Sequence, residues 1–253
     1  MITKPAIIAH RGASVQCHQN TMAAFRQAVA DGADGIEFDL RLSADRQWVV
    51  HHNPDAIVSG APIRLNRLTL AEINQLRIGT GEERIPSLSE FLDWARQQPV
   101  SLMFDIKDTE GIAELVSTVE RVGVPSRVVF SSFNRPVLRQ LRQLRPQWPR
   151  AVIVDDPRWK LTRQLLSGWL VSSALRGKMV ALHLHQRWIT PSLITAAQSA
   201  GIKVAVWTVD DPALITMLAF LGVDSIITND PALGRQTIEQ VNTQMSGKGL
   251  CAP

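Results

Sequence analysis

Strand-like apolar runs alternate with helix-like segments along almost the whole chain, and this alternation limits the possible folds more than any other feature. The helices have readable signals, such as the apolar face of Thr21–Ala30 and the capping-box pattern of Ser87–Glu90. Alternating strands and helices predict a parallel sheet with right-handed crossovers. The candidate strands are Ala6–His10, Gly35–Leu40, Trp48–His52, Ser101–Lys107, Arg127–Phe133, Arg150–Asp155, Met179–His183, Lys203–Val209 and Ser225–Thr228.

One of these runs is surplus to an eight-stranded barrel, and it can be identified. Only residues 41–47 separate the second run from the third, whereas a crossover between parallel strands needs about a dozen residues. These two runs are therefore expected to form an antiparallel hairpin. The remaining strands predict a closed (β/α)8 TIM barrel. The alternative is an open doubly wound sheet, but no glycine-rich phosphate loop follows the first strand.

The hairpin also makes a prediction about register. A turn centred between Ala44 and Asp45 would place His52 directly opposite Glu37, with both side chains on one face. A slip of one residue would bring His51 to that position instead.

Composition predicts a single domain over residues 1–253, because 45% hydrophobic residues suffice for one core and no linker divides the chain. The net charge is +4, and arginines recur at helical spacing in residues 135–150. This spacing favours a solvated helix face over a nucleic-acid patch. We therefore expect a small anionic substrate and no nucleic-acid partner.

The expected location is the cytoplasm. Cys17 and Cys251 are too few and too far apart for a disulfide framework, and the N-terminal residues lack a signal-peptide pattern. The longest apolar run, Ala213–Val223, is shorter than the roughly 20 residues that span a bilayer, so no stable membrane insertion is expected. Nothing in the sequence indicates an oligomeric state.

Chemically capable side chains gather at the C-terminal ends of the candidate strands, where barrel enzymes place their active sites. Four of the six histidines lie at such ends. The strand-end residues are His10, Arg11, Glu37, Asp39, His51, His52, Asp105, Lys107, Ser131, His183, Trp207 and Asn229.

Three of these residues, Glu37, Asp39 and Asp105, form a set of carboxylates that suits Mg²⁺ or Ca²⁺ better than zinc. Without a cation they would repel one another. The alternative is that Arg11 and Lys107 neutralise them in a purely structural network.

Two imidazoles beside a metal suit phosphodiester cleavage, since one can deprotonate the attacking hydroxyl and the other can protonate the leaving alkoxide. We assign these roles to His10 and His52, with Arg11 stabilising charge on the phosphate. His51 is expected to point away from the mouth and His18 to lie on the solvated rim. His183 is either a ligand contact or a core residue.

The ordered motifs resemble the glycerophosphodiester phosphodiesterase family over residues 6–235. They run from His10-Arg11-Gly12 through Glu37-Phe38-Asp39 and Val49-Val50-His51-His52 to Trp207-Thr208-Val209 and Thr228-Asn229-Asp230-Pro231. The resemblance implies a barrel enzyme that uses one divalent cation, Mg²⁺ or Ca²⁺. Such an enzyme releases an alcohol from a glycerophosphodiester and leaves sn-glycerol 3-phosphate.

Matched by position, the resemblance implies that His10 and His52 are the catalytic pair and that Arg11 and Lys107 contact phosphate. Glu37, Asp39 and Asp105 would hold the metal, while His183 and Trp207 are candidate substrate contacts. A small insertion is expected at about residues 54–81.

Three positions depart from the family pattern. Gln19 and Asn53 stand where the family has Glu and Asp, and Asp105 stands where it has Glu. An Asp beside a catalytic histidine would raise the pKa of that histidine, so Asn53 is expected to shift the pH optimum. The shorter Asp105 remains a competent ligand if the cation lies slightly closer.

Two alternatives to this function remain. A lysophospholipase D would cleave lipids that keep one acyl chain and would need an apolar groove, for which Trp159, Trp169 and Trp188 are candidates. A binding barrel could have lost turnover through Gln19 and Asn53, although retention of both histidines and all three carboxylates argues against this.

Overall fold

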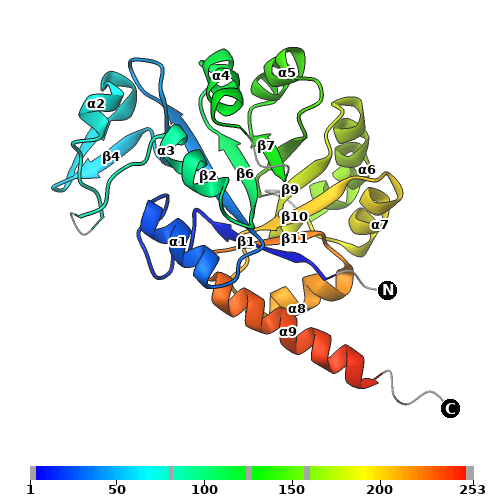
Figure 1. Ribbon diagram of the computed structural model, residues 1–253. Coiled ribbons are helices and arrows are strands. Elements are labelled where there is room, and N and C mark those ends of the chain that lie inside the picture. The colour runs from blue at the N-terminus through cyan, green and yellow to red at the C-terminus, as the bar shows by residue number, and fades with distance from the viewer. Residues whose placement is uncertain (1–3, 80–81, 124–126, 157–159, 249–253) are drawn as a thin grey trace.

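The computed structural model describes residues 4–79, 82–123, 127–156 and 160–248. Within these residues parallel strands close into a barrel, because β1 pairs with β11 on one side and with β2 on the other (Figure 1). The predicted TIM barrel is thereby confirmed. The barrel strands are β1 (Ala6–His10), β2 (Gly35–Leu42), β6 (Ser101–Ile106), β7 (Val128–Ser132), β8 (Arg150–Val154), β9 (Ala181–His185), β10 (Lys203–Trp207) and β11 (Ser225–Thr228).

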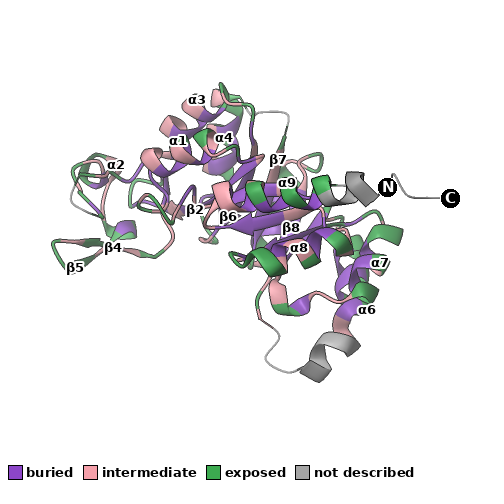
Figure 2. Cartoon of the chain, turned by 90° about the horizontal axis from the view of Figure 1, so that it is seen from below, coloured by how far each residue is buried: buried purple, intermediate pink, exposed green. Residues whose placement is uncertain are grey.

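Helices surround the barrel, and their inward faces are buried while their outer faces are exposed (Figure 2). Several begin as the sequence predicts: Thr21, Thr190 and Asp211 each accept a hydrogen bond from a first-turn backbone N–H. The helices are α1 (Met22–Ala30), α3 (Leu88–Ala95), α4 (Ile112–Val122), α5 (Arg135–Leu144), α6 (Lys160–Arg176), α7 (Pro191–Ser199), α8 (Pro212–Leu221) and α9 (Pro231–Lys248), with a 3-10 turn η2 (Gln186–Trp188). No described helix is long and apolar enough to traverse a bilayer.

The predicted hairpin exists, but its register is not the predicted one. Strand β3 (Trp48–Val50) pairs antiparallel with β2, and Leu40 lies opposite Val50. This is one residue away from the expected pairing, because the turn is closed between Ser43 and Gln47 and is therefore centred on Asp45. Glu37 is thus not opposite His52, which follows the end of β3 in a loop.

The segment after β3 folds outside the barrel, at the edge of the molecule in Figure 1. It contains a second hairpin, β4 (Asp55–Val58) with β5 (Ala61–Arg64), followed by η1 (Leu65–Arg67) and α2 (Leu70–Ile73). These two strands were not among the candidates from the sequence. The segment has its own small core around Leu65 and Ile73.

Two further sequence expectations need correction. Strand β9 ends at His185, so His183 lies inside the strand and is buried, not at the strand end. Arg150 is also buried, and its guanidinium donates there to backbone carbonyls, including that of Trp148 at 2.6 Å. The arginines of residues 135–150 therefore do not all belong to one solvated helix face.

Candidate active site

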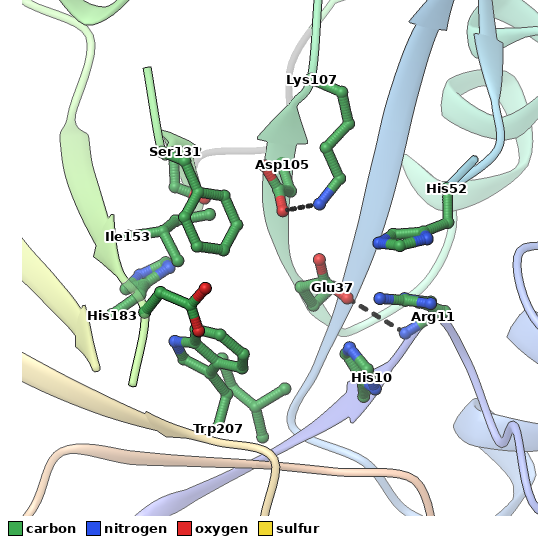
Figure 3. A pocket seen from close by; sticks show the side chains of 13 residues that line it. His10, Arg11, Glu37, His52, Asp105, Lys107, Ser131, Ile153, His183 and Trp207 are labelled. Carbon is green, nitrogen blue, oxygen red and sulfur yellow. Dashed lines mark hydrogen bonds and ion pairs between the residues drawn. The ribbon is translucent and has the colours of Figure 1, made fainter. Parts of the chain in front are cut away.

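A cavity of about 260 Å³ opens at the C-terminal ends of the barrel strands (Figure 3). Side chains from all eight barrel strands and from the loops after them line it, so residues remote in sequence meet there. Its floor is closed by Ile8, Met103, Ala205 and Ile227, which fill the barrel interior. The lining residues are His10, Arg11, Glu37, His52, Asp105, Lys107, Ser131, Phe133, Ile153, Asp155, His183, Trp207 and Ile227.

The tight turn after β1 brings Arg11 against Glu37. The backbone N–H of Arg11 donates to the carbonyl of Glu37 at 2.9 Å and to its carboxylate Oε2 at 3.1 Å. The next residue, Gly12, has φ +85°, and a Cβ there would lie 2.7 Å from atoms of Ala24. Gly12 is therefore a steric requirement of this turn, while Arg11 supplies charge.

The three predicted carboxylates do converge. Glu37, Asp39 and Asp105 are buried, and each offers an oxygen within 4.8 Å of the others. Arg11 and Lys107 lie among them: Arg11 Nε is 3.0 Å from Asp39 Oδ2, and Lys107 Nζ is 2.8 Å from Asp39 Oδ1. Lys107 also contacts Asp105.

In this network three carboxylates face only two cationic side chains, those of Arg11 and Lys107. The excess of carboxylates argues against a purely structural role. Burial raises the pKa of Glu37 well above its usual value, and burial likewise raises that of Asp105 to about 6. Burial also pushes the pKa of Asp39 upward, but the charges of Lys107 and Arg11 outweigh it and hold that pKa below its usual value. Asp105 Oδ1 is buried without a hydrogen-bond partner among the described residues. The donor set thus fits a hard divalent cation.

A hydrogen-bond relay fixes the ring of His10. Asn229 donates from its amide nitrogen to Asp210 at 2.6 Å, so its oxygen faces His10 Nδ1 at 2.7 Å and accepts that proton. The other ring nitrogen, Nε2, is then the unprotonated one. Burial lowers the pKa of His10 to about 4, with the Arg11 charge adding to the effect. His10 is therefore a neutral imidazole at pH 7.

His52 has a looser setting. It lies in the loop after β3, and its Nδ1 is 2.9 Å from Asn53 Oδ1 at the protein surface. Burial lowers the pKa of His52, while the Asp39 charge opposes that shift. The neutral Asn53 supports protonation of the ring less than a carboxylate would.

The remaining sequence candidates separate clearly. His183 and Trp207 line the cavity. His51 does not line it, and its Nε2 lies 3.3 Å from the backbone oxygen of Asp55. His18, in the loop after β1, lies near Gly79 of the segment after β3, which we call the outer segment. Asp39 is not in the lining either; it lies directly beneath, where Asn20 Nδ2 donates to it at 2.8 Å.

Comparison with known proteins agrees with this geometry. The family model of the glycerophosphoryl diester phosphodiesterase family matches residues 10–233. The chain belongs to this family. A glycerophosphodiester phosphodiesterase of Caldanaerobacter subterraneus subsp. tengcongensis is 33% identical over 241 residues, which cover 90% of this chain and 95% of the relative. The expected class of enzyme, a phosphoric diester hydrolase, is thereby confirmed.

Solved structures of the family have the same barrel. A phosphodiesterase of Oleispira antarctica, in complex with the product sn-glycerol-3-phosphate, has a TM-score of 0.82 at 26% identity over 93% of this chain and 97% of its own. A glycerophosphodiester phosphodiesterase of Parabacteroides distasonis has a TM-score of 0.79 at 24% identity, covering 96% and 98% of the two chains. At that identity the second likeness shows the fold alone.

One departure from the glycerophosphodiester phosphodiesterase pattern has a visible consequence. Gln19 accepts a hydrogen bond from Arg11 Nη1 at 2.7 Å, so the guanidinium keeps a partner although the family's negative charge is missing. Gln19 thus orients the Arg11 guanidinium through this hydrogen bond, but the neutral amide compensates less of the Arg11 charge than a carboxylate would.

Sequence reasoning missed several residues of the site. The sequence indicates Asn229 only as a strand-end residue and Asn20 only as part of the Asn20-Thr21 motif that opens a helix, and it gives no signal for Asp210. Phe133 and Asp155 also line the cavity, and the Phe133 ring meets Trp207 edge-on with ring centroids 5.8 Å apart. Their place at strand ends was the available signal, but uncharged or isolated side chains there have no distinctive spacing.

The apolar groove of the lysophospholipase D alternative finds no support among the described residues. Trp169 is on the surface of α6, and Trp188 is buried with its Nε1 donating to the backbone oxygen of Asp155 at 2.6 Å. Neither residue lines the cavity. Trp159 lies outside the described residues.

Proposed function

We propose that this chain hydrolyses glycerophosphodiesters to an alcohol and sn-glycerol 3-phosphate. His10 and His52 act as the acid–base pair, and Arg11 and Lys107 bind phosphate. The observation that carries the proposal is that both histidines, the cationic side chains of Arg11 and Lys107 and two of the three carboxylates line one cavity. This cavity is large enough for a small phosphodiester.

Glu37, Asp39 and Asp105 hold one divalent cation, Mg²⁺ or Ca²⁺, in this proposal. When bound, the cation polarises the phosphoryl oxygens and neutralises negative charge in the transition state. Lys107 already contacts two of the three carboxylates and also lines the cavity, so its ammonium can bind a phosphate oxygen while staying near the metal ligands.

His10 is the better base of the pair. Its Nδ1 proton is held by Asn229, so the unprotonated Nε2 can accept the proton of the attacking hydroxyl. His52 then supplies a proton to the leaving alkoxide. Its hydrogen bond to Asn53 lies at the surface, where the ring can exchange protons with water between turnovers.

The proposal also includes the domain organisation, the partner and the location of the protein. Residues 1–253 form one domain, with the segment at about residues 54–81 as an insertion. The partner is a small-molecule phosphodiester, with no nucleic acid and no stable membrane insertion, and the location is the cytoplasm. His183 and Trp207 are substrate contacts.

The test is direct. Purified protein is incubated with glycerophosphocholine and either Mg²⁺ or Ca²⁺, and glycerol 3-phosphate is assayed enzymatically. We expect product formation that stops with EDTA and falls by about a thousandfold or more in His10→Ala, because general acid–base catalysis contributes at least two to four orders of magnitude. His18→Ala, outside the cavity, is the matched control. Equal product with chelator, or in His10→Ala, contradicts the proposal, and cleavage of lysophosphatidylcholine alone would point to a lysophospholipase D.

A further inference from the structure

His183 and Trp207 are neighbours on the inner face of the barrel. Strands β9 and β10 pair in parallel with His183 beside Ala205 and His185 beside Trp207. Side chains two residues apart on a strand share a face, so Trp207 lies diagonally across from His183. Figure 3 shows both rings on the side of the cavity that lies across from Arg11 and His52.

Each of these rings has a buried nitrogen with no hydrogen-bond partner among the described residues. These atoms are His183 Nε2 and Trp207 Nε1, and His183 is only 2% exposed. A buried polar group without a partner is costly, and native proteins seldom keep one without a reason. Both residues line the cavity, so a ligand group that enters between the two rings could complete both atoms.

The chemistry of the two atoms restricts that group. The indole nitrogen can only donate. Burial lowers the pKa of His183 to about 4, so its imidazole is neutral at pH 7, and Nε2 accepts in the tautomer that carries the proton on Nδ1, which is the tautomer that we consider for His183. A group that accepts from one neighbour and donates to the other is an alcohol hydroxyl. A carboxylate, an ammonium or an acyl ester can satisfy only one of them.

We propose that His183 and Trp207 form a hydroxyl-binding subsite, in which a free hydroxyl of the glycerol moiety donates to His183 Nε2 and accepts from Trp207 Nε1. This inference rests on the proposed function, because the phosphate must lie between the His183–Trp207 side of the cavity and the side that carries Arg11 and His52. It makes the pair the determinant of specificity for fully deacylated substrates, since esterification removes the hydroxyl proton that His183 accepts.

Substrate analogues test the subsite. Glycerophosphocholine is compared with propane-1,2-diol phosphocholine, which lacks only the terminal hydroxyl, and with lysophosphatidylcholine, in which that hydroxyl is esterified. Because choline has no other hydroxyl, any preference reports on the glycerol side of the phosphate. We expect kcat/KM of the wild type to be at least about tenfold higher for glycerophosphocholine than for either analogue.

Variants assign that preference to the two rings. Trp207→Phe removes the donor and keeps an aromatic ring, and His183→Leu removes both ring nitrogens at similar volume. Each is expected to lower kcat/KM about tenfold more for glycerophosphocholine than for the deoxy analogue, so that the preference disappears. His183→Gln keeps an acceptor and should retain part of the preference, whereas Trp94→Phe on α3, outside the cavity, should retain all of it.

Bis(4-nitrophenyl) phosphate, which has no hydroxyl, reports whether each variant remains folded and catalytically competent. Its hydrolysis by Trp94→Phe should match that of the wild type, and continued hydrolysis by Trp207→Phe and His183→Leu shows that the catalytic groups of those variants are intact. A preference that survives in both Trp207→Phe and His183→Leu overturns the subsite, as does a wild type that shows no preference. Failure of the proposed function has a different signature: the wild type would release no glycerol 3-phosphate from glycerophosphocholine.

Discussion

The two walls of the cavity satisfy their polar groups in different ways. The charged wall consists of His10, Arg11, Glu37, His52, Asp105 and Lys107, and its members are linked by ion pairs and hydrogen bonds within the protein, although Asp105 Oδ1 has no hydrogen-bond partner among the described residues. The β9–β10 wall consists of His183 and Trp207, and neither ring makes any hydrogen bond through its buried nitrogen, His183 Nε2 or Trp207 Nε1, to the described residues.

This difference separates two tasks. In the proposed reaction the charged wall pre-organises groups around the phosphorus atom, which requires fixed positions before substrate arrives. The β9–β10 wall is completed only when a ligand binds, so it reports on what the ligand must contain. Perturbing the charged wall should therefore change the rate for every substrate, whereas perturbing the β9–β10 wall should change the choice between substrates.

The largest effect on activity is expected from substitution of a proposed metal ligand in the charged wall. Asp105→Asn should raise the Mg²⁺ or Ca²⁺ concentration needed for half-maximal activity by at least about a hundredfold, because loss of an outer partner of a ligand already costs about 10- to 100-fold. Calorimetric titration of the ion into the protein measures the affinity without turnover.

Two companion variants delimit this result. Asp105→Glu restores the residue usual in the family and should bind the ion. Asp108→Asn changes a nearby carboxylate that pairs with Arg41 instead, and it should leave ion affinity unchanged. Unaltered affinity in Asp105→Asn would show that the cation is not held there.

A second comparison concerns stability in acid. The pKa of buried His183 is about 4, against 6.5 for the free side chain. Between these values the unfolded chain binds a proton that the folded chain does not, so stability is fully present above pH 6.5 and is lost as the pH falls towards 4. Over this window His183→Leu should remove up to about 3 kcal/mol of the pH-dependent loss.

Urea unfolding at several pH values measures this effect. The difference between variant and wild type should change from pH 6.5 to pH 4 and stay constant above pH 7. His10 and His51 titrate in the same window and are present in both proteins, so they cancel. If the stability of variant and wild type changes in parallel at every pH, His183 titrates in the folded protein as it does in the unfolded chain.

The smallest effect is expected at Asn53. Asn53→Asp places a carboxylate beside His52 and should raise the pKa of that ring by about one unit. Because His52 acts in its protonated form, the alkaline limb of the kcat/KM profile should move up by about one pH unit. Asn66→Asp, an exposed position in the outer segment, is the matched control. A shift of the acidic limb instead would assign His52 as the base.

The sequence predicted the barrel and the charged wall because both rest on strong local signals. Strand ends carry charged residues in recognisable motifs, and a parallel barrel brings all strand ends to one face. The register of the hairpin could not be predicted in this way. Its turn contains one residue more than a turn centred between Ala44 and Asp45 allows, and either turn fits the same sequence.

The β9–β10 wall was beyond sequence reasoning for a related reason. Whether His183 faces the cavity depends on where β9 ends, and the predicted strand Met179–His183 ended two residues early. Whether its ring lacks a partner depends on the packing of β8 and β10 around it. Trp207 could be identified from its place at a strand end, but its unpaired ring nitrogen could not.

The bond between His10 and Asn229 joins residues 219 positions apart. Strand β1, which carries the proposed base, can pair with β11 only after residues 225–228 have been synthesised. A nascent chain that stops before Ser225 lacks both the strand that closes the barrel and the amide that sets the tautomer of His10. If His10 is the base, such a chain is not yet competent for catalysis.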